Sequence, residues 1–310
     1  MELAGTMHPG PIVVGVERSE RSRDALALAR TLARAMETRL IVVAVYPLEP
    51  RSAAIERGAL GRALAEEARA TLEWVTRPLA GVRAQCRAVP CTSIARGLRE
   101  VAEAESALAV VVGPSHRGAA GRLVLGSVGE RLLREAPCPV AVAPRGFWGD
   151  SVQRLRSIGV GYVTTPEADA ALDAAVGLAA RTGAQVRAIS VVEPPPIPLG
   201  LPFSWDYREL EAGARENVDR RLREAIADVP ATVRASATVT DGYADDELAR
   251  LSHDVDLLVC GSRRHGRIGT LLGSVSTGVL RKARCPVLVV PRGARDGFAA
   301  LAAPVAGVAP

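Results

Sequence analysis

The chain has 310 residues, of which 48% are hydrophobic and 24% are charged, and its formal net charge is +5. This composition is typical of globular proteins and excludes disordered and collagen-like chains. No apolar run approaches the roughly 18 to 20 residues of a membrane-spanning helix, and the first residues lack the basic and apolar regions of an export signal. Aromatic residues make up 3% of the chain and the arginines do not cluster with them, which argues against nucleic-acid binding. Five scattered cysteines without metal or redox spacing indicate a reducing, cytoplasmic location.

The predicted elements occur twice in the same order. Short β-branched runs alternate with helical patterns, which is typical of a parallel, doubly wound α/β sheet. In the first copy the strands and the two most regular helices are predicted at 11–16, 22–36, 39–46, 55–79, 82–89, 108–113 and 138–144. In the second copy they are predicted at 157–163, 167–182, 185–192, 207–229, 232–240, 256–261 and 285–291.

The last helix and strand of each copy make the duplication plain. Residues 125–146 and 272–293 are identical at 14 of 22 positions without a gap. Other matching positions lie about 146 residues apart, which is the length of one ordinary domain. The sequence therefore predicts one domain over 1–150, a second over 151–295, and a flexible tail over 296–310.

A glycine-rich loop follows the fourth apolar run of each copy. It reads "GPSHRGAAGRLVLGS" from Gly113 and "GSRRHGRIGTLLGS" from Gly261. Glycines allow backbone amides to approach an anion, and each loop leads into a helix whose free amides favour phosphate. Ser127 and Ser274 are predicted as N-caps, and Ser127 with Glu130 forms a capping-box pattern that would compete for those amides. The alternative interpretation is an ordinary glycine-rich turn with a serine cap.

These loops, the amphipathic helix after each Gly-Ser pair and the final "CPV" strand with its Pro-Arg end resemble the universal stress protein family. The resemblance covers nearly the whole of both copies. It implies two adenine-nucleotide-binding, Rossmann-like domains, each with a five-stranded parallel sheet. It also implies that the final strands pair to form an intramolecular pseudo-dimer, with ATP held across the ends of the first and fourth strands.

The first copy matches most of the family's nucleotide motif. A histidine stands at the second motif glycine, and a glutamate stands where the first strand usually ends in Asp. The resemblance assigns nucleotide contacts to Glu17, Leu40, Gly113, His116, Gly126, Ser127 and Val128. In this assignment Leu40 is the second-strand position whose backbone reads adenine. His116 either donates to a phosphate or lies on the loop surface.

The second copy departs further from the motif. Its loop is one residue shorter, Arg264 replaces the second glycine, and Val163 replaces the acid. The corresponding nucleotide positions are Val186, Gly261, Arg264, Gly273, Ser274 and Val275. Arg264 is suited to phosphate by its charge and planar fork, with a solvated surface arginine as the alternative. We therefore expect the first copy to be the better nucleotide site.

The sequence gives no indication of catalysis. It has no Walker-type loop, and its four scattered histidines do not indicate a Ser-His-Asp arrangement. Slow ATP hydrolysis would have only Glu17 as a base, so we do not expect an enzyme. The leading hypothesis is a stress-response regulator that binds ATP, accompanied by Mg, in at least one half. The alternative is a nucleotide-free scaffold or dimerisation protein with degenerate loops. Expected partners are an adenine nucleotide, a protein of unknown identity and further copies in a homo-oligomer.

One segment has no counterpart in the first copy. Residues 193–210 are rich in proline and contain Phe203, Trp205 and Tyr207. A stiff proline-rich loop with exposed aromatic side chains is suited to cover the cleft or to dock a partner. The alternative is a long connection whose aromatic rings pack on their own domain.

Overall fold

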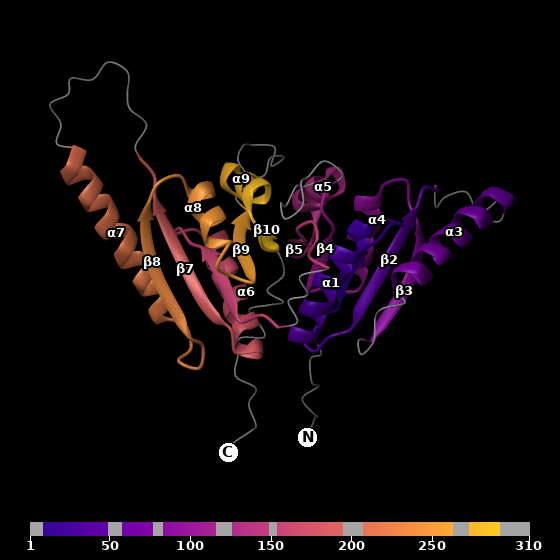
Figure 1. Ribbon diagram of the computed structural model, residues 1–310, viewed down its shortest axis with the longest axis horizontal. Coiled ribbons are helices and arrows are strands. Elements are labelled where there is room, and N and C mark those ends of the chain that lie inside the picture. The colour runs from indigo at the N-terminus through magenta and orange to yellow at the C-terminus, as the bar shows by residue number, and fades with distance from the viewer. Residues whose placement is uncertain are drawn as a thin grey trace, which may run out of the picture.

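The computed structural model describes residues 9–48, 58–76, 83–115, 126–148, 154–194, 207–262 and 273–291. Two similar halves lie side by side, with helices α3 and α7 at the outer ends (Figure 1). His116, Arg264 and most of the proline-rich segment lie outside the described residues, as does the tail predicted over 296–310.

The described residues of each half form five strands connected through helices. The first half consists of β1 (Ile12–Gly15), α1 (Glu20–Ala35), β2 (Leu40–Tyr46), α3 (Ala59–Thr76), β3 (Ala84–Pro90), α4 (Ile94–Ala104), β4 (Ala109–Val112), α5 (Ser127–Glu135) and β5 (Val140–Val142). The second half consists of β6 (Ser157–Gly161), α6 (Pro166–Thr182), β7 (Gln185–Val192), α7 (Tyr207–Ala227), β8 (Ala235–Asp241), α8 (Ala244–Leu251), β9 (Leu257–Ser262), α9 (Ser274–Lys282) and β10 (Val287–Pro291).

All ten strands form one continuous sheet in the order β3-β2-β1-β4-β5-β10-β9-β6-β7-β8. The strands are parallel within each half. The halves meet where β10 pairs with β5 in antiparallel register, with Leu288 opposite Ala141. This confirms the predicted pseudo-dimer, because the apolar final strands cover each other's edges instead of exposing them.

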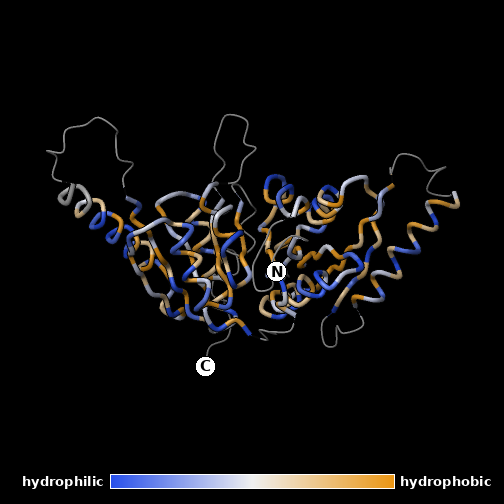
Figure 2. Tube along the Cα trace, turned by 45° about the horizontal axis from the view of Figure 1, so that its top comes forward, coloured by the Kyte–Doolittle hydropathy of each residue, from blue (hydrophilic) through white to orange (hydrophobic). Residues whose placement is uncertain are grey.

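The two faces of the sheet carry separate cores. Strand side chains alternate between the faces, so that Ile12 and Val14 pack with α1, α3 and α6 while Val13 packs with α4 and α5. The second core also contains side chains of α8 and α9. Hydrophobic colour follows the strands, whereas the helices alternate between hydrophobic and hydrophilic (Figure 2). Both cores therefore continue across the junction between the halves.

A buried carboxylate fixes the turn that follows β5. Asp24, in α1, is 4% exposed. It accepts hydrogen bonds from the backbone amides of Gly146 at 3.1 Å and Trp148 at 2.9 Å. Burial raises the pKa of this carboxyl group, against the opposing effect of the two amides. The repeat position in the second half is Ala170, so the contact belongs to the first half alone.

None of the helices in the described ranges is both long enough and apolar enough to cross a membrane.

Candidate functional site

A cleft of about 1300 Å³ opens at the carboxyl ends of β1, β2 and β4 in the first half. The strand order reverses between β1 and β4, and open α/β sheets bind their ligands at such a switch point. The lining continues from the strand ends onto α3, α4 and α5, and then onto α9 of the second half. The cleft therefore has a direction, from the end of β2 to the junction of the two halves.

The outer end of the cleft is largely apolar. Its floor is formed by Ala44, Val45 and Tyr46 at the end of β2. Its wall includes Leu64 and Ala68 from α3 and Ile94 and Leu98 from α4. Such a surface suits a planar, weakly polar group, since small-molecule sites are lined mainly by apolar side chains with few polar contacts.

The inner end of the cleft is formed by the first turn of α5. Gly126 is the N-cap residue, with extended backbone angles of φ −90° and ψ 170°, and no side chain caps the helix. Ser127 is the first residue of the helix, so its prediction as an N-cap was wrong by one position. The capping box is absent for the same reason, because the amide of Glu130 bonds to the carbonyl of Gly126 in the helix itself. First-turn amides have no partner within a helix, and Gly126, Ser127, Val128 and Gly129 line the cleft.

The glycines at the two loop ends have different surroundings. A Cβ at Gly113 would lie 2.6 Å from the carbonyl oxygen of Arg21, so only glycine lets β4 end against the start of α1. A Cβ at Gly126 would lie 3.8 Å from Ser115. The residues on either side of the glycine-rich loop are therefore neighbours, as the spacing of the motif implied.

Glu17 lines the cleft directly after β1. Its carboxylate accepts hydrogen bonds from the Ser19 hydroxyl at 3.0 Å and from Arg21 at 2.8 Å. The Glu17 amide donates to the Ser22 hydroxyl at 2.8 Å. Glu17 is 53% exposed in its side chain and Arg21 21%, and ion pairs of this kind contribute at most about 1 kcal/mol. The pair orients both side chains at the cleft without holding them strongly.

Charged side chains of both signs line the cleft. The arginines are Arg18, Arg21, Arg134 and Arg281, and the glutamates are Glu17, Glu67 and Glu130. Within the described ranges, no ion pair is formed by Arg18, Arg134 or Arg281. The cleft therefore carries a small positive excess that suits an anionic ligand.

The two residues predicted to read adenine, one in each half, lie away from the carboxyl ends of their strands. Leu40 begins β2 and pairs with Ile12 at the start of β1, and Val186 pairs with Ile158 near the start of β6. Both side chains are fully buried and lie at the amino ends of their strands. The prediction selected the wrong end of each run. The rule that ligands bind at carboxyl ends identifies Ala44 to Tyr46 instead.

The second half uses its corresponding loop ends differently. A Cβ at Gly261 would lie 2.3 Å from the carbonyl oxygen of Glu167, so this glycine also permits a close approach. The Ser276 hydroxyl donates to the Gly261 carbonyl at 3.0 Å. Gly273 is the N-cap of α9, so Ser274 is the first helical residue and its predicted N-cap role was also wrong by one position. Ser274 is exposed and Val275 half-buried.

The corresponding strand ends of the second half carry different side chains. Glu167, only 4% exposed, stands at the repeat position of Arg21, and Val163, 39% exposed, at that of Glu17. Tyr162 replaces Val16, and its hydroxyl donates to Asp169 at 2.9 Å. Burial, followed by this hydrogen bond, raises the pKa of Tyr162 to about 12.

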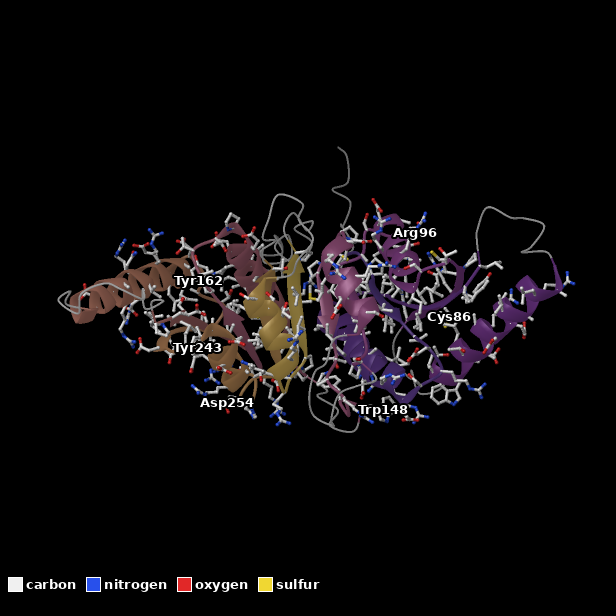
Figure 3. The ribbon with its side chains drawn as sticks, turned by 90° about the horizontal axis from the view of Figure 1, so that it is seen from above. Cys86, Arg96, Trp148, Tyr162, Tyr243 and Asp254 are labelled. Atoms are coloured by element: carbon white, nitrogen blue, oxygen red, sulfur yellow. The ribbon has the colours of Figure 1, made fainter. Side chains whose placement is uncertain are left out.

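Helix α8 begins with three acids, which form ion pairs with Arg250 and Lys282. Leu98 and Leu248 pack on Gly15 and Gly161 respectively, which makes α4 and α8 equivalent. Counted from these leucines, Ala95, Arg96 and Gly97 of α4 correspond to Asp245, Asp246 and Glu247 of α8. Figure 3 shows Arg96 near the start of α4 and Tyr243 at the N-cap of α8. The first turn of the two helices therefore differs in charge.

Comparison with known proteins gives consistent matches over both halves. The model of the universal stress protein family matches residues 9–144 and 154–291. A universal stress protein of Mycobacterium tuberculosis is 37% identical over 184 residues, and this match spans 58% of the chain and only 60% of that relative. Another from the same organism is 27% identical over 294 residues, covering 90% of the chain and 99% of the relative. The crystal structure of a universal stress protein from Archaeoglobus fulgidus has a TM-score of 0.65 at 20% identity, with coverage of 92% and 97%, which shows a shared fold.

Proposed function

This chain belongs to the universal stress protein family, and we propose that it is a cytoplasmic stress-response regulator that binds ATP in the cleft of its first half. The observation that supports the proposal most strongly is the order of surfaces along that cleft. An apolar end over β2 is followed by the switch point between β1 and β4, and then by the first turn of α5. A nucleotide has the same order of base, sugar and phosphates.

Each end of the cleft suits one part of ATP. Adenine would lie against Ala44, Val45 and the α3 and α4 side chains, which offer apolar contact and strand-end backbone groups. The phosphates would lie at the first turn of α5, where amides and the helix dipole favour anions. Arg18 and Arg21 line the route between the two ends, and Glu17 would accept hydrogen bonds from the ribose hydroxyls.

A magnesium ion would be held mainly by the phosphates. Across the described residues, no three His, Cys, Asp or Glu side chains are grouped so that they could hold a metal ion. Mg²⁺ commonly binds through substrate phosphates and one or two carboxylates, and Glu17 is the first acid after β1. The magnesium ion would neutralise part of the negative charge of the phosphates.

We assign a scaffold role to the second half. Glu167 stands at the repeat position of Arg21 and Val163 at that of Glu17, so the corresponding edge lacks two of the side chains that we assign to the nucleotide. The two hypotheses from the sequence, an ATP-binding regulator and a nucleotide-free scaffold, then apply to different halves. The first half binds the nucleotide and the second half supports it. The protein would signal by conformation or by association, with a protein partner or further copies of itself, and not by turnover. Glu17, already bonded to Ser19 and Arg21, is poorly arranged as a base.

Two measurements on the full-length chain test the proposal. Acid denaturation of the purified protein should release ATP or AMP, and titration calorimetry should show ATP binding to one site per chain. Arg21→Glu should weaken ATP binding by about tenfold or more and adenosine binding by much less, since only ATP carries phosphates and the shared effect passes through Glu17, which Arg21 contacts. Glu17→Ala should weaken both ligands to a similar degree, because both carry the ribose.

Arg69→Glu is the matched control for Arg21→Glu. Arg69 lies on α3 in the same half and is 63% exposed; its one ion pair among the described residues is with Glu66 at 3.2 Å, and it does not line the cleft. The same charge change there should leave ATP binding within about twofold of the original value. Absence of bound nucleotide and of any ATP binding would contradict the proposal.

A further inference from the structure

The cleft of the first half extends beyond that half. Thr277, Leu280 and Arg281, which belong to α9, line it together with the first turn of α5. Antiparallel pairing of β5 with β10 places α5 and α9 on the same face of the sheet, on either side of the junction (Figure 1). Leu132 and Leu133 of α5 share one core with Val279 and Leu280 of α9. The position of α9 at the cleft is therefore set by packing.

Adjacent cations in the last turn of α9 have different surroundings. Lys282 contacts Asp245 at 2.6 Å and Asp246 at 2.7 Å, which holds it against α8. Arg281 is exposed, lines the cleft, and has no acidic partner among the described residues. Thr277 lies four residues earlier, on the same side of the helix, and its hydroxyl donates to the Gly273 carbonyl at 3.1 Å. Helix α9 thus presents a cation and a hydroxyl to the cleft.

The contribution of Arg281 decides the sign of the charge in the cleft. The first half supplies the arginines Arg18, Arg21 and Arg134 and the glutamates Glu17, Glu67 and Glu130. These charges cancel in number. Arg281 provides the positive excess, and it does so at the inner end, where the phosphates of the proposed ligand would lie.

We propose that the second half completes the nucleotide site of the first, with Arg281 as a phosphate-binding residue contributed across the junction. The proposal rests on ATP binding in the first half. The bound nucleotide then contacts both halves at once, through α5 of the first and α9 of the second. The preferred ligand is a nucleotide with an extended phosphate chain, since adenosine ends before it reaches α9.

Calorimetry on the full-length chain at low salt tests this proposal with ATP and adenosine as probes. Arg281→Ala should weaken ATP binding about fivefold and leave adenosine binding unchanged, since an exposed charged contact contributes modestly. Lys282→Ala removes the same charge from the next position and should leave ATP binding unchanged. ATP should also slow hydrogen exchange of the α9 amides in the original protein, and this effect should diminish in Arg281→Ala.

The outcomes separate the two proposals. ATP binding that is equal in Arg281→Ala, Lys282→Ala and the original chain would overturn the role of Arg281 and leave the proposed function intact. Equal losses for ATP and adenosine in Arg281→Ala would also overturn it, because the effect would not involve phosphate. Failure of the original chain to bind ATP would overturn both proposals.

Discussion

The carboxyl edge of the first half and that of the second half have the same backbone plan and different chemistry. Each has a glycine at the end of its fourth strand in sequence order, close to the backbone of the first helix of the same half. Each also has a Gly-Ser helix start. Arg21 and Arg96 in the first half correspond to Glu167 and Asp246 in the second. The comparison teaches that the glycines preserve the fold while the charged side chains diverge, and the proposed function attributes nucleotide binding in the first half to that divergence.

The largest expected effect tests the first part of that comparison. Gly113→Ala would place a Cβ 2.6 Å from a backbone carbonyl, and Gly261→Ala would place one at 2.3 Å. Both should lower the free energy of unfolding by about 2 to 3 kcal/mol, since backbone cannot move aside cheaply. Denaturant unfolding measures this. Gly126→Ala, with its nearest neighbour at 3.8 Å, is the control and should cost less than about 1 kcal/mol. A stable Gly261→Ala variant would show that the two glycines have different roles.

The next effect concerns a contact found only in the first half. Asp24→Ala leaves the amides of Gly146 and Trp148 without their acceptor. It should lower the free energy of unfolding by about 1 to 3 kcal/mol. Ala170, the corresponding residue in the second half, has no such contact to lose. Ala170→Ser is therefore the control, and it should change the free energy of unfolding by less than Asp24→Ala does.

The pH dependence of the same contact has a definite sign. Burial raises the pKa of Asp24 in the folded state, so the folded chain binds the proton more tightly than the unfolded chain. Relative to Asp24→Asn, the original protein should lose stability as the pH rises from about 4, the unfolded value, through the raised folded pKa. Urea unfolding at a series of pH values measures this difference. A difference that stays constant, or that grows with pH, would contradict it.

The smallest effect concerns the tyrosine that replaces Val16 in the second half. Tyr162 has a pKa of about 12 in the folded state, so its contribution is intact below about pH 10 and is lost as the pH rises toward 12. Absorbance titration should show a late tyrosine step that disappears in Tyr162→Phe. That variant should lose about 1 kcal/mol at neutral pH. A titration that matches the original protein would assign the late step to another tyrosine.

Much of the fold could be predicted from the sequence. The repeat is visible by direct comparison, and the alternation of apolar strand segments with helical patterns depends on residues close together in the chain. Even the weak third strands were placed correctly, as β3 and β8. The site was harder to predict. Leu40 was chosen from the correct strand at the wrong end, and Ser127 was taken as a cap because cap and first helical residue differ only in backbone angles. Arg281 was missed because its place at the cleft depends on the β5–β10 junction, a contact between segments more than a hundred residues apart in sequence.

The antiparallel junction of β5 and β10 has a consequence for divergence and for assembly. Two separate chains would form such a junction only at sufficient concentration, whereas linked domains meet at a high effective concentration whatever the amount of protein. In a dimer of identical chains, every substitution appears at both edges at once. In the duplicated chain each edge can change alone, so Glu167 can replace a basic residue on one side while Arg21 stays on the other. Covalent linkage thus permits an asymmetric molecule in which one copy holds a ligand and the other lends it a side chain.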